Sequence, residues 1–172
     1  MRVKIEPTNV EKKMRDNDFI VSKTDLKGRI TYCNRIFMEF AKYTEEELLG
    51  KPHSLIRHPD MPRAVFKLLW DTVQDKKEIN AYVKNLSADG SFYWVFANVT
   101  PVLDENGEVA GYYSVRRKPD EKALETIKGL YSTLLQEETL GGKKEGMEAS
   151  TKILTDLLTE KGMTYEELIF SL

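Results

Sequence analysis

Cysteine is nearly absent from this chain, and so are long hydrophobic runs. Its 172 residues include one cysteine, Cys33, which excludes an internal disulfide and any zinc site built on several thiolates. No apolar stretch approaches the roughly 20 residues of a membrane-spanning helix. The polar N-terminal residues also lack the apolar core of a signal peptide. We therefore expect a cytoplasmic protein that does not insert into a membrane and would associate with one only through a partner.

Neither sign of charge dominates the composition. The 26 Lys and Arg residues nearly balance the 28 Asp and Glu residues, so no basic surface for nucleic acid is expected. The hydrophobic fraction of 41% suffices for the core of one domain with extensions. Phosphate-binding glycine loops, zinc patterns and nucleophile elbows are also missing from the sequence. We expect a binding or signalling protein rather than an enzyme.

The order of strand and helix signals predicts an α+β fold. Turns at Gly28, at Asp89-Gly90 and at Asn106-Gly107 separate alternating segments that are typical of antiparallel strands. Thr44 and Thr164 each precede a Glu by three residues, which is the capping box that starts a helix. The result is a five-stranded antiparallel sheet with helices inserted between strands two and three, followed by C-terminal helices. The expected strands are 19–24, 29–32, 82–86, 91–101 and 109–116, and the expected helices are 34–42, 45–49, 63–73, 120–138 and 147–161.

These elements divide the chain into three parts. We expect a mobile N-terminal leader at residues 1–17, an α+β domain at residues 18–118 and a helical extension at residues 119–172. Apolar residues in the extension recur at intervals of three and four, as in amphipathic helices. The exposed apolar stripe of such helices needs a cover. That cover is the domain itself, a second copy in a homodimer, or another protein.

A turn between two prolines carries the strongest signal for a binding site. Proline restricts the backbone around Arg57, His58 and Asp60, and the helix that follows presents Phe66 and Trp70. A cation, an imidazole and a carboxylate on a rigid turn predict the lip of a ligand pocket. Simpler structural explanations stand beside this one, because Asp60 also suits the N-cap of the helix or an ion pair with Arg57, and aromatic side chains at helical spacing usually form core.

Two other positions have both a structural and a functional interpretation. Asn34 follows a strand and either caps the next helix or contacts a ring carbonyl or nitrogen of a ligand. Trp94 and Asn98 share one face of the strand 91–101, where a polar residue among aromatics indicates ligand contact. His53 is expected to be structural.

Several motifs together resemble the PAS domain of bacterial aerotaxis receptors, over about residues 18–118. They are Asn34, Gly50-Lys-Pro-His53, Arg57-His-Pro-Asp-Met-Pro62, Phe66, Trp70, Val83-Lys-Asn85, Gly90, Tyr93-Trp-Val95, Ala97-Asn98, Pro101 and Gly111-Tyr112. In that family the PAS domain binds FAD non-covalently and reports redox state or electron-transport status to a chemotaxis signalling domain. The resemblance implies a free-standing, cytoplasmic energy-taxis sensor that signals to a membrane-bound chemoreceptor-type signalling protein.

The resemblance makes Asn34, Arg57, His58 and Asp60 candidates for cofactor contact, with Phe66 and Trp70 as wall. Together with the strand positions above and the family positions 79 and 85, they make up the expected cofactor-binding residues. They are Asn34, Arg57, His58, Asp60, Phe66, Trp70, Ile79, Asn85, Trp94 and Asn98. The chain departs from the family pattern at Ile79, where a tryptophan is usual, at Leu86-Ser87, where a basic pair is usual, and at Phe96, where an arginine is usual. These departures remove an aromatic platform and three positive charges. Haem b, another small ligand, or a cofactor-free interaction and dimerisation module therefore remain alternatives to FAD.

Overall fold

The structure is a computed structural model that describes residues 4–172. Residues 1–3, at the start of the expected leader, lie outside the described residues. The sheet has the order β2-β1-β5-β4-β3, all pairs being antiparallel, so the expected α+β fold is confirmed. The strands are β1 (Ile20–Thr24), β2 (Ile30–Cys33), β3 (Ile79–Leu86), β4 (Phe92–Leu103) and β5 (Val109–Arg117). The helices are α1 (Arg35–Ala41), α2 (Glu45–Leu48), the 3-10 helix η1 (His53–Ile56), α3 (Arg63–Gln74), α4 (Glu121–Leu140), α5 (Glu145–Lys161) and α6 (Tyr165–Ser171).

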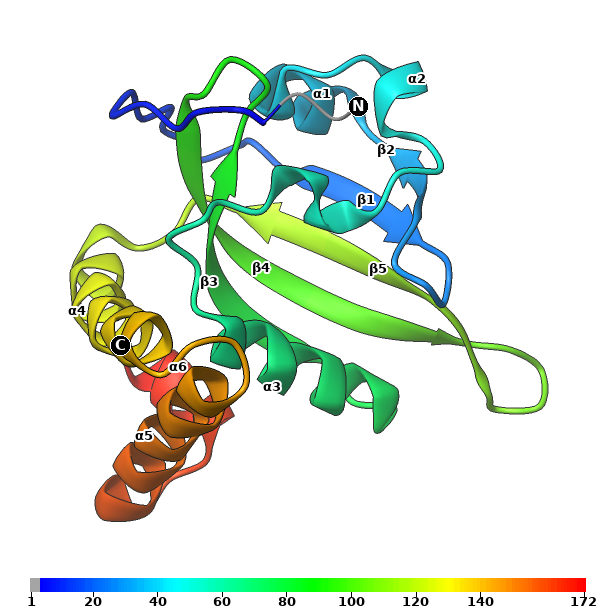
Figure 1. The fold of residues 1–172 in the computed structure, drawn as a ribbon. Coiled ribbons are helices and arrows are strands. Elements are labelled where there is room, and N and C mark those ends of the chain that lie inside the picture. Colours follow the sequence, from blue (N-terminus) through cyan, green and yellow to red (C-terminus); the bar gives the residue numbers. More distant parts are fainter. Residues whose placement is uncertain (1–3) are drawn as a thin grey trace.

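The two faces of the sheet are covered by different parts of the chain (Figure 1). The segment from α1 to α3 covers the face that we call inner, and α4 and α6 cover the outer face. Because side chains alternate along a strand, Tyr93, Val95 and Ala97 point to the inner face, whereas Trp94 and Phe96 point to the outer one. The fully buried side chains of Phe37 and Tyr93 lie between the sheet and the inner helices.

The apolar side chains of helices α4 and α6 pack against the outer face of the sheet of the same chain. Tyr131 of α4 packs against Trp94, with ring centroids 6.2 Å apart, and its hydroxyl donates a 2.7 Å hydrogen bond to the carbonyl oxygen of Tyr82. Phe170 of α6 lies edge-on to Phe96. Helix α5 packs on α4 and also contacts α3. Within residues 4–172, none of the helices combines the length and apolar composition that crossing a bilayer requires.

The expectation of a mobile leader is wrong for residues 8–14, which are docked on the domain. Backbone hydrogen bonds join Thr8 to Gly90, and join Lys12 and the carbonyl of Val10 to Phe92. Met14 is buried in the main core. The segment therefore runs beside the turn between β3 and β4, as Figure 1 shows.

Candidate ligand-binding cavity

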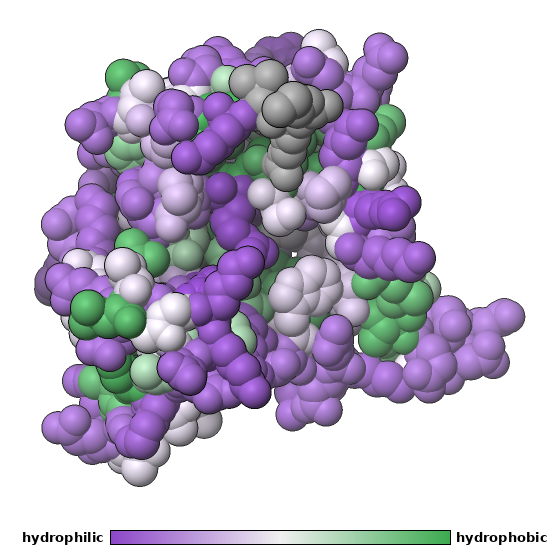
Figure 2. All heavy atoms as spheres, in the orientation of Figure 1, coloured by the Kyte–Doolittle hydropathy of each residue, from purple (hydrophilic) through white to green (hydrophobic). Residues whose placement is uncertain are grey.

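A cavity of about 320 Å³ lies between the inner face of the sheet and α3. This volume is at the lower end of the roughly 300–1,000 Å³ that small-molecule sites occupy. The surface on this side is mostly hydrophilic, with hydrophobic residues visible in recesses near the middle and in a few places at the surface (Figure 2). The residues that line the cavity include Ser22, Gly28, His53, Arg57, Phe66, Leu69, Trp70, Val73, Asn85, Ala97, Val99, Tyr112, Ser114 and Arg116.

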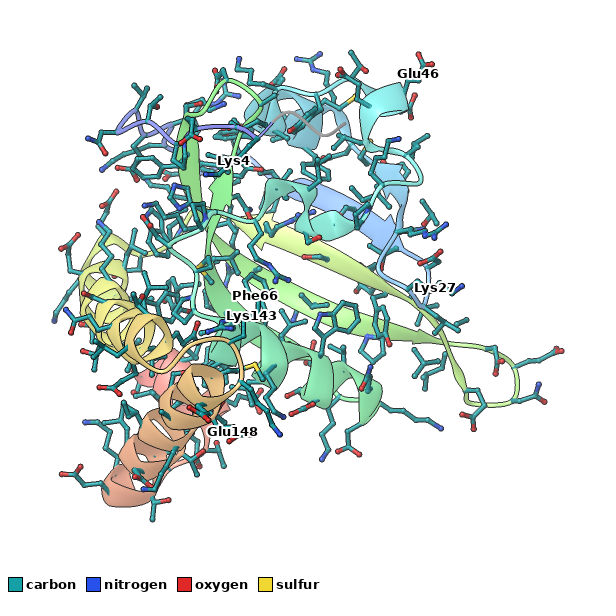
Figure 3. The ribbon with its side chains drawn as sticks, viewed as in Figure 1. Lys4, Lys27, Glu46, Phe66, Lys143 and Glu148 are labelled. Carbon is teal, nitrogen blue, oxygen red and sulfur yellow. The ribbon has the colours of Figure 1, made fainter. Side chains whose placement is uncertain are left out.

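Helix α3 supplies the apolar wall of the cavity. Its residues Phe66, Leu69, Trp70 and Val73 recur at spacings of three and four, so one face of the helix meets the cavity. The Trp70 ring meets Tyr112 of β5 edge-on, with centroids 5.3 Å apart. Figure 3 labels Phe66 on this helix.

The turn between β1 and β2 closes one side of the cavity against Trp70. Gly28 in this turn has a φ of +73°, which suits glycine, and a Cβ there would come within 3.3 Å of the Trp70 ring. Lys27, labelled in Figure 3, precedes it in the lining. A side chain at position 28 would therefore press on the Trp70 ring at the edge of the cavity.

A polar cluster from three elements forms the opposite end of the cavity. Arg116 of β5 donates to Nε2 of His53 at 3.0 Å and also to the hydroxyl of Ser22. Ser22 Oγ lies 3.1 Å from the same imidazole nitrogen. Because a guanidinium can only donate, Nε2 of His53 is the acceptor and carries no proton.

The surroundings of His53 keep its ring neutral. Burial lowers the pKa of His53 to about 3, and the positive charges of Arg116 and Arg57 lower it in the same direction. The ring is stacked against Phe37, with centroids 5.8 Å apart. His53 is therefore a hydrogen-bond acceptor in the cavity wall rather than a cation.

Two guanidinium groups at the cavity have unused donors. The Nε atoms of Arg57 and Arg116 are buried and have no hydrogen-bond partner, and neither side chain forms an ion pair among residues 4–172. Arg57 stacks on Phe66 at 3.6 Å and Arg116 lies over Phe37 at 4.7 Å. Burial lowers the pKa of Arg57, and lowers that of Arg116 to about 10. Since buried charge without a counter-charge is costly, this cavity suits a ligand with acceptor atoms or negative charge.

The structure brings four of the ten expected site residues to the cavity: Arg57, Phe66, Trp70 and Asn85. Ile79 is beside it, because it is buried in a cluster with Leu69 and Val73, which do line the cavity. The position where the family pattern has a tryptophan is thus filled by an apolar side chain under the cavity wall.

The remaining expected residues have structural partners away from the cavity lining. Asn34 is the N-cap of α1, since its Oδ1 accepts from the amides of Phe37 and Val21. Trp94 and Asn98 point to the outer face, where Asn98 bonds to Asn80. The expected pocket face of β4 is therefore not the face that meets the cavity.

His58 and Asp60 lie past the edge of β3. His58 is buried and its Nδ1 accepts from the amide of Asp60, and burial, followed by the charge of Lys84, lowers the pKa of His58 to about 4. The exposed carboxylate of Asp60 binds Lys84 at 2.7 Å. Asp60 therefore pairs with Lys84 instead of Arg57. The expected N-cap at Asp60 is also wrong, because the N-cap residue of α3 is Pro62.

Sequence reasoning missed the polar end of the cavity. His53 was expected to be structural, and Ser22 and Arg116 were not singled out. Arg116 is set opposite Ala97 on β4 and Ile20 on β1, so only the strand register places it on the inner face. The one local signal was His53, four residues before Arg57 in a short segment between prolines.

Comparisons with known proteins agree with this architecture. A family model described as PAS fold matches residues 30–116. The aerotaxis receptor of Escherichia coli (strain K12) is 38% identical over 119 residues, which cover 69% of this chain and 23% of that receptor. The PAS domain of a protein from Colwellia psychrerythraea is 21% identical with a TM-score of 0.55, covering 59% of this chain and 86% of that one. A light-oxygen-voltage domain, from work on a flavin analogue, is 20% identical with a TM-score of 0.56, covering 63% of this chain and 82% of that one.

The chain belongs to the PAS-fold family. It contains a PAS sensor domain related to the aerotaxis receptor and, by fold, to light-oxygen-voltage domains. PAS domains are generally signalling modules. The chain spans about a fifth of the length of the curated relatives it matches.

Proposed function

We propose that this chain is a cytoplasmic redox sensor that binds FAD in the cavity between α3 and the sheet. The observation that carries the proposal is the pair of guanidinium groups of half-buried Arg57 and buried Arg116, whose buried Nε donors have no hydrogen-bond partner. The likeness to the aerotaxis receptor, and to a light-oxygen-voltage domain from work on a flavin analogue, supports flavin over other ligands.

The residues around the cavity fit a flavin ring in their chemistry. The ring system has a polar edge of carbonyl oxygens and nitrogens and an otherwise apolar aromatic body. Arg57, Arg116 and Asn85 offer donors to the polar edge, and Phe66 and Trp70 offer aromatic walls to the body. A bound flavin would supply reversible electron transfer.

The chain's own contribution is positioning and charge. Arg57 and Arg116 hold positive charge beside the site, so they stabilise added negative charge there. Neutral His53 holds the Arg116 guanidinium in place through a 3.0 Å hydrogen bond. A ligand that fills the cavity would displace solvent from these groups, which would strengthen each of these interactions. The site binds and reports, and we assign it no catalysed reaction.

The output of the sensor is proposed to be a membrane-bound chemoreceptor-type signalling protein. The supporting observation is the relationship to a relative named as an aerotaxis receptor, in which the matched region is 23% of the whole protein. A homodimer is compatible with this scheme. The C-terminal helices α4 to α6 would present the signal, because α4 and α6 cover the outer face of the sheet that carries the cavity and α5 packs on α4.

The test is the visible spectrum of the full chain as purified and after reduction with dithionite, followed by titration with FAD. We expect flavin bands that bleach on reduction. Arg116→Met removes a charged donor, so FAD affinity should fall roughly tenfold or more. The matched control is Arg117→Met, because Arg117 is the exposed neighbour whose guanidinium lies over Phe96 on the other face.

Three results would contradict the proposal. A folded, colourless protein that does not bind added FAD rejects a flavin sensor and favours an interaction module. A Soret band assigns the site to haem. Equal loss of FAD affinity in Arg116→Met and Arg117→Met would show that Arg116 does not act at the binding site.

A further inference from the structure

The N-terminus of α3 is capped by a side chain from a distant helix. The first turn of a helix leaves backbone amides without partners inside the helix. The side chain of Pro62, the N-cap residue, has no acceptor atom for these amides. The two carboxylate oxygens of Glu138, in α4, accept from the amides of Arg63 and Ala64 at 2.8 and 2.9 Å. Glu138 therefore caps the N-terminus of α3, although it lies 75 residues after Arg63 and 74 residues after Ala64 in the sequence.

The same carboxylate joins α3 to the helical extension. Ser150 of α5 donates to Glu138 at 2.8 Å. The Arg63 side chain reaches the carboxylate at 3.2 Å and also donates to the carbonyl oxygens of Gly142 and Lys143 in the turn between α4 and α5. Lys143 and, one turn into α3, Phe66 are both labelled in Figure 3.

The environment of Glu138 favours the ionised, bonded form. Its side chain is 4% exposed. Burial by itself would raise the pKa of Glu138, but the hydrogen bonds from Arg63, Ala64 and Ser150 outweigh burial and lower it. Replacing the carboxylate by an uncharged amide would remove one of its two acceptor oxygens and leave at least one backbone amide at the start of α3 without its partner, which is costly.

The contacts of Glu138 with Arg63, Ala64 and Ser150, which we call the Glu138 clamp, hold the start of helix α3. From its first turn onward this helix lines the cavity. Phe66 is three residues after Arg63, and Arg57 of the cavity stacks on it at 3.6 Å. We propose that Glu138 is a positioning residue that couples the ligand cavity to α4 and α5: it fixes the cavity wall, and cavity occupancy in turn tightens the hold on the C-terminal helices. The coupling to a ligand rests on the proposed function, whereas the hold of Glu138 on α3 does not.

The first experiment needs no ligand. Amide hydrogen exchange of the full chain is compared for the unaltered protein, Glu138→Gln and the matched control Glu137→Gln, which removes a carboxylate one residue earlier on α4. We expect Glu138→Gln to accelerate exchange in the first turn of α3 and in α5 by roughly tenfold or more, and Glu137→Gln to change neither. Ser150→Ala, which removes one hydrogen bond from the α5 side, should act in the same direction and more weakly.

The second experiment adds FAD. Coupling between two sites is reciprocal, so Glu138→Gln should raise the dissociation constant of FAD about fivefold or more. FAD should also slow exchange in α5 of the unaltered protein and have little effect on α5 of Glu138→Gln. A residue that only supports the fold would not remove this response of α5 to a ligand held by α3.

Two outcomes overturn the inference. Exchange in the first turn of α3 that is the same in Glu138→Gln and Glu137→Gln shows that the carboxylate does not hold this helix. FAD affinity that is unchanged in both Glu138→Gln and Ser150→Ala shows that the clamp is not coupled to the cavity. If the unaltered chain binds no FAD, the proposed function fails, and the α3 exchange decides whether Glu138 fixes the cavity wall.

Discussion

The neutral imidazole of His53 makes the stability of the domain depend on pH. In the unfolded chain a histidine has a pKa of about 6.5, whereas burial and the charges of Arg116 and Arg57 lower the pKa of folded His53 to about 3. Between these two values the unfolded chain binds a proton that the folded chain does not. Stability therefore rises with pH across this window and is lost as the pH falls from about 6.5 toward 3.

The magnitude follows from the width of the window. One pKa unit corresponds to about 1.4 kcal/mol, so lowering the pH from about 6.5 to 5 would cost at most about 2 kcal/mol from His53. The ring borders a cavity that opens to solvent, which reduces the effect to about 1 kcal/mol. That is a measurable part of the roughly 5–15 kcal/mol that stabilises a typical domain.

The assay is reversible urea unfolding at pH 7 and pH 5 for the unaltered chain and for His53→Gln. Glutamine keeps a polar group next to Arg116 but cannot be protonated. We expect the unaltered chain to lose about 1 kcal/mol more than the variant between the two pH values. His58 contributes equally to both proteins and cancels in this difference. If the two proteins lose the same stability on acidification, the reasoning about His53 is refuted.

Two further substitutions test other contacts. Tyr131→Phe removes the buried 2.7 Å hydrogen bond to the carbonyl of Tyr82, so urea unfolding should show a loss of about 1–2 kcal/mol; no loss would mean that water satisfies that carbonyl. Gly90→Ala places a Cβ 2.6 Å from the carbonyl oxygen of Glu6 at a φ of +84°, so hydrogen exchange in the docked segment 8–14 should accelerate, and unchanged protection there would contradict the docking.

The parts of the fold that the sequence predicted well depend on local signals. Thr44 and Thr164 form capping boxes with Glu residues three positions later, as expected from spacing alone. The docking of residues 8–14 was missed because, apart from the buried side chain of Met14, it depends mostly on backbone pairing with Phe92 and Gly90. Backbone pairing over such a distance leaves no pattern in the side chains of either segment.

The candidate site was harder to predict for a related reason. Alternation along β4 correctly groups Trp94 with Asn98, but it does not say which face the inserted helices cover. The N-terminal cap of α3 could not be predicted from local spacing either. Spacing favoured Asp60 as the capping residue, whereas the carboxylate that accepts from the first amides of α3 is that of Glu138, some 75 residues further along the chain. The tertiary structure therefore decides which face of β4 meets the cavity and which carboxylate caps α3.

The departures from the aerotaxis-receptor pattern acquire a different meaning once they are placed on the sheet. Phe96 points to the outer face, where it packs against Tyr82 and Phe170, and Leu86 alternates with cavity-lining Asn85 and is buried. These two positions do not line the cavity, whose lining holds the cations Lys27, Arg57 and Arg116. At position 96 an apolar side chain instead forms part of the surface on which α6 packs, and an arginine buried there would require a counter-charge. Phe96, one of the departures that weakened the sequence argument for FAD, thus makes one of the contacts that let α6 lie on the sheet.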